Sequence, residues 1–450
     1  MQLPPRVELP PEAQSPQEAP APPEPTGKSW YVSPKGSDGG KGTLDSPLRT
    51  ISRAVALASP GDAIRVLPGV YAEQLLLSSR GTSADAILLR GEGSPRPRLV
   101  PGDRTRSTLV HVQGRWRVEN LELDVDGAPM IAIAFETGSS HAALADSELH
   151  GGTGGAGVLV EGGQDITLQN NTIHHFIRSG EDSHGVAVVG PSRNIILRDN
   201  DIHHNSGDSI QCQEGSAPAD TVLIEDNKLH EEGENGVDIK RCRNITVRYN
   251  VLSDFPNTSV RAPGSSAGEA VVIHDAAQGV AIQGNTILRA GRGVSVVDTP
   301  AENLWVEANV IEDIRNFPEG NGQGIRIASA KNVVVADNRI VGTASYGLML
   351  AADGQLVTGL TVRNNALQGG SQPLLLRLGR DSFHPGIILQ ENHYLHGGVL
   401  KADGVQDKLT GINAGYRVEF SGEQLPLSSP EKLDVWRQVL QVDQGSGLLQ

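Results

Sequence analysis

The chain has few cysteines and aromatic residues, and it lacks long apolar runs. Two of its 450 residues are cysteines, and Phe, Trp and Tyr together make up 4%. No apolar segment reaches the roughly 20 residues that a membrane-spanning helix needs. The net charge of −15 argues against nucleic acid as a partner, because a phosphate backbone selects basic surfaces. The chain does have 53 glycines, so many tight turns around an aliphatic interior are expected.

The two cysteines are expected to be free thiols. Cys212 falls on the inner face of a predicted strand, whereas Cys242 falls past the end of the corresponding strand that follows. An offset of three residues along a strand amounts to about 10 Å. That distance exceeds the separation that a disulfide tolerates, so the sequence predicts two unpaired thiols.

A short phrase recurs along the chain: a β-branched run, then Asn, any residue, and Ile or Leu. The steps between its anchor positions are 24, 29, 27, 23, 35, 24, 29, 27 and 27 residues. A period of this size is typical of stacked supersecondary units. The anchors are Ser147, Asn171, Asn200, Asn227, Asn250, Asn285, Asn309, Asn338, Asn365 and Asn392.

A second and shorter strand-like phrase follows each anchor, as in residues 185–188 and 236–239. Apolar residues alternate within these phrases, which is strand periodicity, and no long helical pattern separates them. A chain of this kind satisfies its strand hydrogen bonds by coiling, so that each strand pairs with its counterpart one coil away. We therefore predict an all-β, single-stranded parallel β-helix, a solenoid of about ten coils, with the repeating Asn as an interior ladder.

The composition changes along the chain. Residues 1–27 are rich in Pro, Glu, Ala and Gln and are expected to be a disordered, extended tether. We assign residues 28–109 to an N-terminal cap and the first coils, 110–400 to the β-helix and 401–450 to a C-terminal capping segment. No signal peptide is visible, but a Pro-rich tether often follows a removed export signal, so an extracytoplasmic location is expected.

In a β-helix, residues at the same position of consecutive coils form outward rows, and one such face collects charged residues. Carboxylates at roughly 5 Å spacing repel one another, and a Ca²⁺ ion would resolve the conflict. The alternative is a solvated patch of local ion pairs, with Lys240 paired to Asp238 or Glu269. The charged residues are Asp208, Glu234, Asp238, Lys240, Glu269, His274 and Arg292.

The longest step between two Asn anchors, from Asn250 to Asn285, carries the insertion 255–268. We expect this insertion to form a wall of a cleft.

Histidines form a second row in the turn after each anchor. Stacked imidazoles can bind a transition metal or supply a general base. Packing of each His on its neighbours in the turn is the alternative. His203 and His204 fall nearest the charged face in this alignment. The row comprises His150, His174, His203 and His230, with His175 and His204 beside it.

Several segments near the two ends carry a family resemblance. Residues 30–38, 42–47, 51–57 and 60–71 resemble the opening segment of secreted right-handed parallel β-helix proteins of the pectin-lyase-like superfamily. The tail 433–443 resembles the closing segment of carbohydrate-active members. The resemblance covers about residues 28–445 and implies a right-handed coil with a short N-terminal capping helix at about 47–58. Such a cap covers the core and the strand edges of the first coil.

The resemblance implies three candidate reactions: β-elimination of polyuronates, C5 epimerisation of uronates, and glycoside hydrolysis. The Asn-Thr-Asp, Asp-Asp and Gly-His-Gly phrases of polygalacturonase-like hydrolases are absent, as is the Asp-Pro-His-Asp phrase of alginate epimerases. Residues 236–240 loosely resemble the Asp-then-Lys arrangement of calcium-dependent pectate lyases. The leading hypothesis is thus a polysaccharide lyase acting on an acidic polysaccharide. A uronate C5-epimerase and a non-catalytic cell-surface glycan-binding β-helix are the alternatives.

Three sets of residues carry the lyase hypothesis. Lys240 would abstract the proton with help from His204 or His274, and Arg292 and Arg326 would bind substrate carboxylates. We expect a monomer with no nucleic-acid partner and no membrane span. The metal set is Asp208, Glu234 and Asp238 for Ca²⁺; the catalytic set is Lys240, His274 and His204; the substrate set is Arg292, Arg326 and Glu269.

Overall fold

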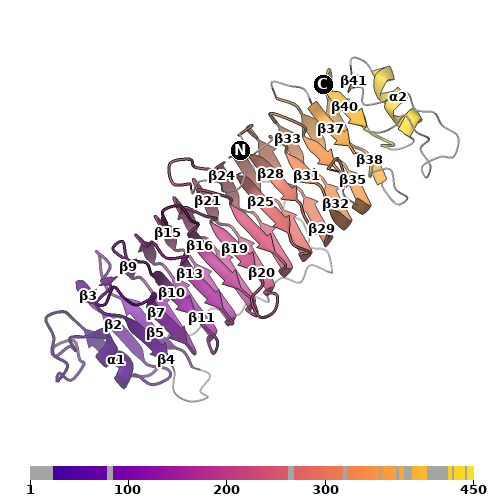
Figure 1. Cartoon of the computed structure of the whole chain (residues 1–450). Coiled ribbons are helices and arrows are strands. Elements are labelled where there is room, and N and C mark those ends of the chain that lie inside the picture. The colour runs from indigo at the N-terminus through magenta and orange to yellow at the C-terminus, as the bar shows by residue number, and fades with distance from the viewer. Residues whose placement is uncertain are drawn as a thin grey trace. The chain divides into compact units, whose positions relative to one another are not determined.

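The computed structural model describes residues 24–78, 85–261, 268–317, 322–353, 357–370, 374–379, 388–402, 424–427, 430–440 and 443–449. They belong to two compact units. Within the described residues, the N-terminal unit comprises those of 24–233 and 258–261, and the C-terminal unit comprises those of 234–257 and 268–449. In each unit the strands stack into three sheets (Figure 1), in parallel except that Gln424–Pro426 pairs antiparallel with Val399–Ala402. The predicted right-handed parallel β-helix is therefore confirmed.

Each coil passes through the three sheets in a fixed order, which we call A, B and C. Sheet A of the N-terminal unit comprises β1 (Ser29–Val32), β2 (Ala63–Val66), β5 (Ile87–Gly91), β8 (Trp116–Glu119), β11 (Ser140–Ala145), β14 (Gln164–Gln169), β17 (Arg193–Arg198) and β20 (Asp220–Glu225). Sheet B comprises β3 (Val70–Ala72), β6 (Arg98–Val100), β9 (Glu122–Asp124), β12 (Glu148–His150), β15 (Thr172–His174), β18 (Asp201–His203) and β21 (Lys228–His230). Sheet C comprises β4 (Leu75–Ser78), β7 (Thr108–Gln113), β10 (Ile131–Phe135), β13 (Ala156–Glu161), β16 (His184–Val189) and β19 (Ile210–Gln213).

The C-terminal unit repeats this order. Its sheet A comprises β23 (Arg243–Arg248), β26 (Gln278–Gln283), β29 (Ala301–Glu307), β32 (Ala330–Ala336), β35 (Val357–Arg363) and β38 (Ile388–Gln390). Sheet B comprises β24 (Val251–Phe255), β27 (Thr286–Ala290), β30 (Val310–Glu312), β33 (Arg339–Val341), β36 (Ala366–Gln368), β39 (His393–Leu395) and β42 (Gly447–Leu449). Sheet C comprises β22 (Val237–Lys240), β25 (Glu269–His274), β28 (Arg292–Val296), β31 (Ile325–Ile327), β34 (Leu348–Leu350), β37 (Leu374–Leu378), β40 (Val399–Ala402) and β41 (Gln424–Pro426).

The repeating Asn lies at the turn from sheet A to sheet B and forms the predicted interior ladder. In the N-terminal unit, the backbone N–H of Asn171 donates to Asn200 Oδ1 at 3.1 Å, and Asn171 Nδ2 donates to the carbonyl of Leu144. In the C-terminal unit, the N–H of Asn285 donates to Asn309 Oδ1 at 2.9 Å. These side chains are buried, so the ladder satisfies turn groups that water does not reach.

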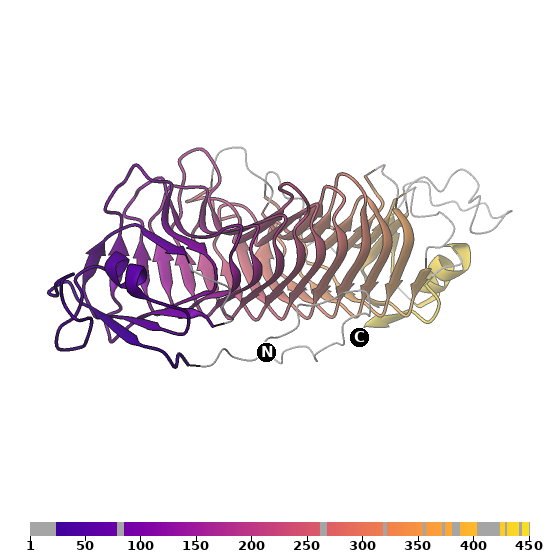
Figure 2. The same cartoon turned by 90° about the horizontal axis from the view of Figure 1, so that it is seen from below.

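One helix lies among the described residues of each unit. In the N-terminal unit, α1 (Ile51–Leu57) packs on β1, β2 and β4 (Figure 2), which confirms the predicted capping helix. Thr50 caps its first turn, and the carboxylate of Glu73 accepts from the N–H groups of Ile51 and Ser52 at 2.9 Å each. A carboxylate at this end of a helix satisfies unpaired donors and favours the helix dipole.

In the C-terminal unit, α2 (Pro430–Leu440) lies beside β42. Its Trp436 is buried, and the indole N–H donates to Asp443 Oδ2 at 3.2 Å. Asp443 also accepts from Asn392 Nδ2 at 2.9 Å, so this carboxylate receives the last described Asn of the ladder. Neither helix has the length and apolar character of a membrane span within the described part of the chain.

The cysteines differ from the sequence-based prediction. Both cysteines are disulfide-bonded, so the prediction of free thiols is wrong. That prediction assumed that the chain stays extended past the strand. Instead, β22 ends at Lys240, and Arg241 turns the chain with φ of 54°. Cys242 is consequently fully buried.

Of the predicted tether, residues 1–23 lie outside the described residues. Glu24, the first described residue, pairs with Arg90 at 3.1 Å.

Candidate functional site

Sheet C of the C-terminal unit brings the predicted catalytic residues of this unit onto adjacent strands. Asp238 and Lys240 face outward from β22, and Lys240 lies opposite His274 of β25 in the strand register. The carboxylate of Asp238 accepts from Lys240 Nζ at 2.8 Å and contacts His274 Nε2 at 2.7 Å. Asp238 therefore holds both an amine and an imidazole, and the alternative of a Lys240–Asp238 ion pair is confirmed.

His274 has carboxylates on both sides of its ring. Its Nδ1 lies 3.3 Å from Asp298 and 4.0 Å from Asp275, two residues in the turns that follow β25 and β28. Burial disfavours the protonated imidazolium, but the hydrogen bond and the negative charge of Asp238 outweigh burial and raise the pKa of His274 above its ordinary value. The ring is therefore suited to hold a proton near neutral pH.

The predicted substrate-binding residues form ion pairs and hydrogen bonds with one another or with neighbouring side chains. Arg292 Nη1 lies 2.5 Å from Glu269, and its Nε donates to Gln323 at 3.1 Å. This pair is buried. Arg326 pairs with Asp353 at 2.8 Å and keeps part of its side chain exposed.

The register adds residues that the sequence alignment missed. The outward row that starts at Asp238 runs through Val272, Ser295, Arg326, Met349, Arg377 and Lys401. Extending the second-strand alignment beyond Arg326 would have found Arg377 and Lys401. Asp275 and Asp298 belong to turns, and a strand alignment gives no signal for them.

The predicted metal and catalytic sets draw on both units. Glu234 and Asp238 belong to the C-terminal unit, and both are buried. Asp208 belongs to the N-terminal unit, where it is fully buried, accepts from Gln211 Nε2 at 3.2 Å and lies 3.2 Å from His184 Nδ1. Of the predicted cleft wall, residues 262–267 lie outside the described residues.

Sheet B of the N-terminal unit carries the predicted row of histidines. His150, His174, His203 and His230 are paired in register, with ring centroids 5.2, 5.1 and 4.9 Å apart. The residue after each strand turns back toward the row with φ of 57° at His175, His204 and Glu231. We call these side chains the imidazole ladder: His150, His174, His175, His203, His204 and His230.

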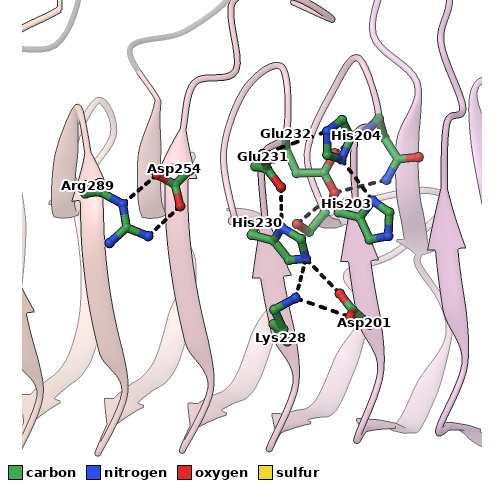
Figure 3. Close-up of polar contacts among 11 residues, drawn as sticks. Asp201, His203, His204, Lys228, His230, Glu231, Glu232, Asp254 and Arg289 are labelled. Atoms are coloured by element: carbon green, nitrogen blue, oxygen red, sulfur yellow. Dashed lines mark hydrogen bonds and ion pairs between the residues drawn. The ribbon is translucent and has the colours of Figure 1, made fainter. Parts of the chain in front are cut away.

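Adjacent members of the imidazole ladder meet through Nδ1. The Nδ1 atoms of His174 and His175 are 2.6 Å apart, and those of His203 and His204 are 2.9 Å apart. In the next coil, His230 Nδ1 lies 2.9 Å from Glu231 instead (Figure 3). His204, a predicted catalytic residue, is thus held within the ladder.

Three members of the ladder favour the neutral imidazole: His203, His174 and His175. The pKa of His203 is lowered to about 4, mainly by burial and then by the charges of His230 and His174, while the charge of Asp201 acts in the opposite direction. Burial also lowers the pKa values of His174 and His175.

A buried carboxylate, Glu232, lies in the interior of the same unit. It accepts hydrogen bonds from the N–H of Asn205 at 2.5 Å and from Asn205 Nδ2 at 3.0 Å. Burial raises the pKa of this carboxyl well above its usual range.

Comparison with known protein families and sequences gives matches over much of the chain. The family described as "Right handed beta helix region" matches residues 114–274 and 218–367, and "Protein of unknown function (DUF1565)" matches residues 34–76. Pectate lyase PEL9 of Emericella nidulans is 25% identical over 224 residues, or 46% of this chain and 48% of the lyase. YwoF, an uncharacterized protein of Bacillus subtilis, is 26% identical over 28% of this chain and 30% of its own length. The chain spans about half, or less, of these curated relatives.

Solved structures share the fold at low sequence identity. PfbA, a surface adhesin of Streptococcus pneumoniae, has a TM-score of 0.58 at 14% identity and covers 71% of this chain and 86% of its own. The alginate lyase AlyGC of family PL6 has a TM-score of 0.57 at 15% identity, with 85% and 55% coverage. The catalytic unit of a GH87 α-1,3-glucanase from Streptomyces thermodiastaticus has a TM-score of 0.54 at 18% identity, with 80% and 67% coverage. These likenesses concern the fold alone.

Proposed function

The chain belongs to the family of right-handed β-helix regions, and from this premise we propose that it is an exported polysaccharide lyase that cleaves an acidic, uronate-containing glycan by β-elimination. The observation that carries the proposal is the contact of one carboxylate, Asp238, with both Lys240 and His274. The partial similarity to pectate lyase PEL9 supports the same substrate class.

β-Elimination needs a base at C5 and an acid at the leaving oxygen. The C5–H bond breaks, its electron pair forms the C4–C5 double bond, and the C4–O4 bond breaks as O4 takes up a proton. Lys240, once deprotonated, is the base in this proposal, and His274 is the acid, since its pKa is raised. The row of Arg326, Arg377 and Lys401 supplies cations that attract the carboxylates of the substrate.

A Ca²⁺ ion is the cofactor that this proposal includes. Carboxylate oxygens are its preferred ligands. Of the three predicted ligands, Glu234 and Asp238 belong to the C-terminal unit, and we assign the ion to these two carboxylates. Bound there, Ca²⁺ would neutralise the uronate carboxylate and compete with Lys240 for Asp238, which favours a neutral amine.

The oxidised cysteines support export. Disulfides persist in oxidising compartments outside the cytoplasm, and both cysteines are disulfide-bonded. In this proposal the lyase is exported to the compartment that contains its polysaccharide substrate.

A screen of polyuronates and glycosaminoglycans tests the reaction. We expect a rise in ultraviolet absorbance from the unsaturated product, which EDTA abolishes. Lys240→Ala should remove activity, whereas Lys331→Ala is the matched control, because Lys331 is also a surface lysine paired with a carboxylate, Glu302, at 2.8 Å. No product from any acidic glycan would overturn the lyase. A shifted uronate ratio without cleavage would establish the C5-epimerase, and binding without turnover would establish the glycan-binding protein.

A further inference from the structure

The outer face of sheet B in the N-terminal unit holds a group of side chains that the proposed lyase reaction does not use. It consists of Asp201 and His203 from β18 and His230 from β21. We propose that these three residues bind a divalent transition-metal ion, with Zn²⁺ as the reference ion.

The strand register brings the three side chains together. His203 and His230 lie opposite each other in β18 and β21, and Asp201 is two residues from His203, so both face outward from the same strand. One ligand atom from each residue lies within 4.8 Å of the other two. Asp201 Oδ1 and His230 Nε2 are already 2.8 Å apart, as Figure 3 shows.

The row departs from parallel stacking at this point. The ring planes of His150 and His174 differ by 8°, and those of His174 and His203 by 4°. The planes of His203 and His230 differ by 27°. The tilt accompanies the contact of His230 with Asp201, a carboxylate one coil away.

The donor set fits a transition metal. Two imidazole nitrogens and one carboxylate are a zinc-binding set that leaves a fourth position open. Ligand atoms around a tetrahedral zinc ion are roughly 3.3 Å apart, given the metal–ligand distances, so side-chain shifts on the order of 1 Å complete the site. Calcium prefers an all-oxygen shell, and nitrogen ligands therefore select against it.

The other nitrogen of each imidazole already has a partner. His230 Nδ1 lies 2.9 Å from Glu231, and His203 Nδ1 lies 2.9 Å from His204 Nδ1. Histidines that ligate metals commonly donate their remaining N–H to a carboxylate or another acceptor, which fixes the ring. Nε2 is therefore the atom through which each ring would bind the ion, and that of His230 already contacts the third ligand, Asp201.

Lys228 contacts two of the three proposed ligands. Its Nζ lies 2.9 Å from His230 Nε2 and 3.4 Å from Asp201. The side chain is 57% exposed, so it can move into solvent when a metal ion binds. This ammonium group competes with the metal, and its removal should tighten binding.

Calorimetric titration of the full, tag-free chain after EDTA dialysis tests the site, with ZnCl₂ and CaCl₂ as separate titrants. We expect Zn²⁺ to bind and to raise the unfolding temperature, with no such effect from Ca²⁺ at this site. His203→Ala and His230→Ala should each weaken zinc binding by about tenfold or more, and Lys228→Met should strengthen it. His141→Ala is the control, because this exposed histidine of sheet A only approaches Asp165, at 3.5 Å.

Three results would overturn the proposal. They are an absence of zinc binding, zinc affinity unchanged in both His variants, and zinc affinity unchanged in Lys228→Met. Circular dichroism without metal shows whether each variant folds. If an alanine variant fails that check, His230→Gln replaces it and should show the same loss. The readout is metal binding, so failure of the lyase proposal leaves this test intact.

Discussion

Sheet B of the N-terminal unit and sheet C of the C-terminal unit both present outward histidines, but the neighbours of these histidines differ. In the imidazole ladder, His203 stacks on other imidazoles and its pKa falls to about 4. On sheet C, His274 lies among Asp238, Asp275 and Asp298, and its pKa rises. Residues at one position of successive coils lie side by side, so the neighbours in the row and in the adjoining turns shift the pKa of each of these two histidines.

This contrast separates two kinds of chemistry. Neutral imidazoles offer lone pairs, which suits metal binding. A protonated imidazole beside carboxylates offers a proton, which suits acid catalysis. Both faces use the same strand geometry, so substitutions at the neighbours of each histidine test the comparison directly.

The largest effect is expected from Asp238→Asn. The variant removes the charge that holds Lys240 and His274, so we expect lyase turnover to fall by about 100-fold or more and the pKa of His274 to fall. Initial rates of product absorbance and an NMR titration of the His274 ring measure the two effects. Asp254→Asn is the control, because Asp254 also pairs with a cation of this unit, Arg289, at 2.6 Å (Figure 3). Equal loss in both variants would refute a special role for Asp238.

The next largest effect is expected from Glu269→Ala. The variant leaves the buried guanidinium of Arg292 without its carboxylate, and breaking a buried ion pair costs about 3–5 kcal/mol of unfolding free energy. Chemical denaturation of the variant, beside the double variant Glu269→Ala/Arg292→Met, measures this cost. Recovery of stability in the double variant is expected; a double variant that is less stable than Glu269→Ala would contradict the argument.

The repeat in the sequence is sufficient to place residues more than 30 positions apart on common rows. The Asn anchors fix the register, and strand alternation then decides which side chains face outward. For this reason the sequence predicts Lys240 and His274 on one face, and the strands pair these two residues directly. The stacking of His203 on His174 follows from the same register.

The features that the sequence could not predict depend on turn conformations and on side-chain rotamers. The prediction of free thiols failed at one left-handed residue, Arg241, which ends the extended strand. The pairing of Arg292 with Glu269 depends on rotamers, which no alignment specifies. Asp298 approaches His274 from a turn, and turn positions do not share the strand register.

A smaller effect is expected on the pH dependence of stability. The lowered pKa of His203 means that the unfolded chain binds more protons than the folded chain between about pH 4 and pH 6.5. The contribution of His203 to the free energy of unfolding is therefore fully present above about pH 6.5 and is lost as the pH falls toward 4. His203→Gln should flatten this acid-side slope in thermal unfolding measured from pH 7 to pH 4.5.

His274 gives the opposite slope and completes the comparison. Its raised pKa means that its contribution is full below the unfolded value and is lost as the pH rises through the folded value. His274→Gln should therefore change the unfolding temperature on the neutral-to-alkaline side and leave the acid-side slope in place. The same slope change in both variants would show that the two faces do not differ in protonation.

The smallest effect is expected from Asp254→Asn on stability. Asp254 and Arg289 form a two-point ion pair on sheet B of the C-terminal unit, and both side chains are about a third exposed, at 35% and 36%. Exposed pairs contribute about 1 kcal/mol or less, because water screens them and side-chain entropy opposes them. The hydrogen bond of the guanidinium lowers the pKa of Asp254, so even this small contribution should disappear as the pH falls below the usual range of a carboxyl. A loss comparable to that of Glu269→Ala would show that burial does not separate the two ion pairs.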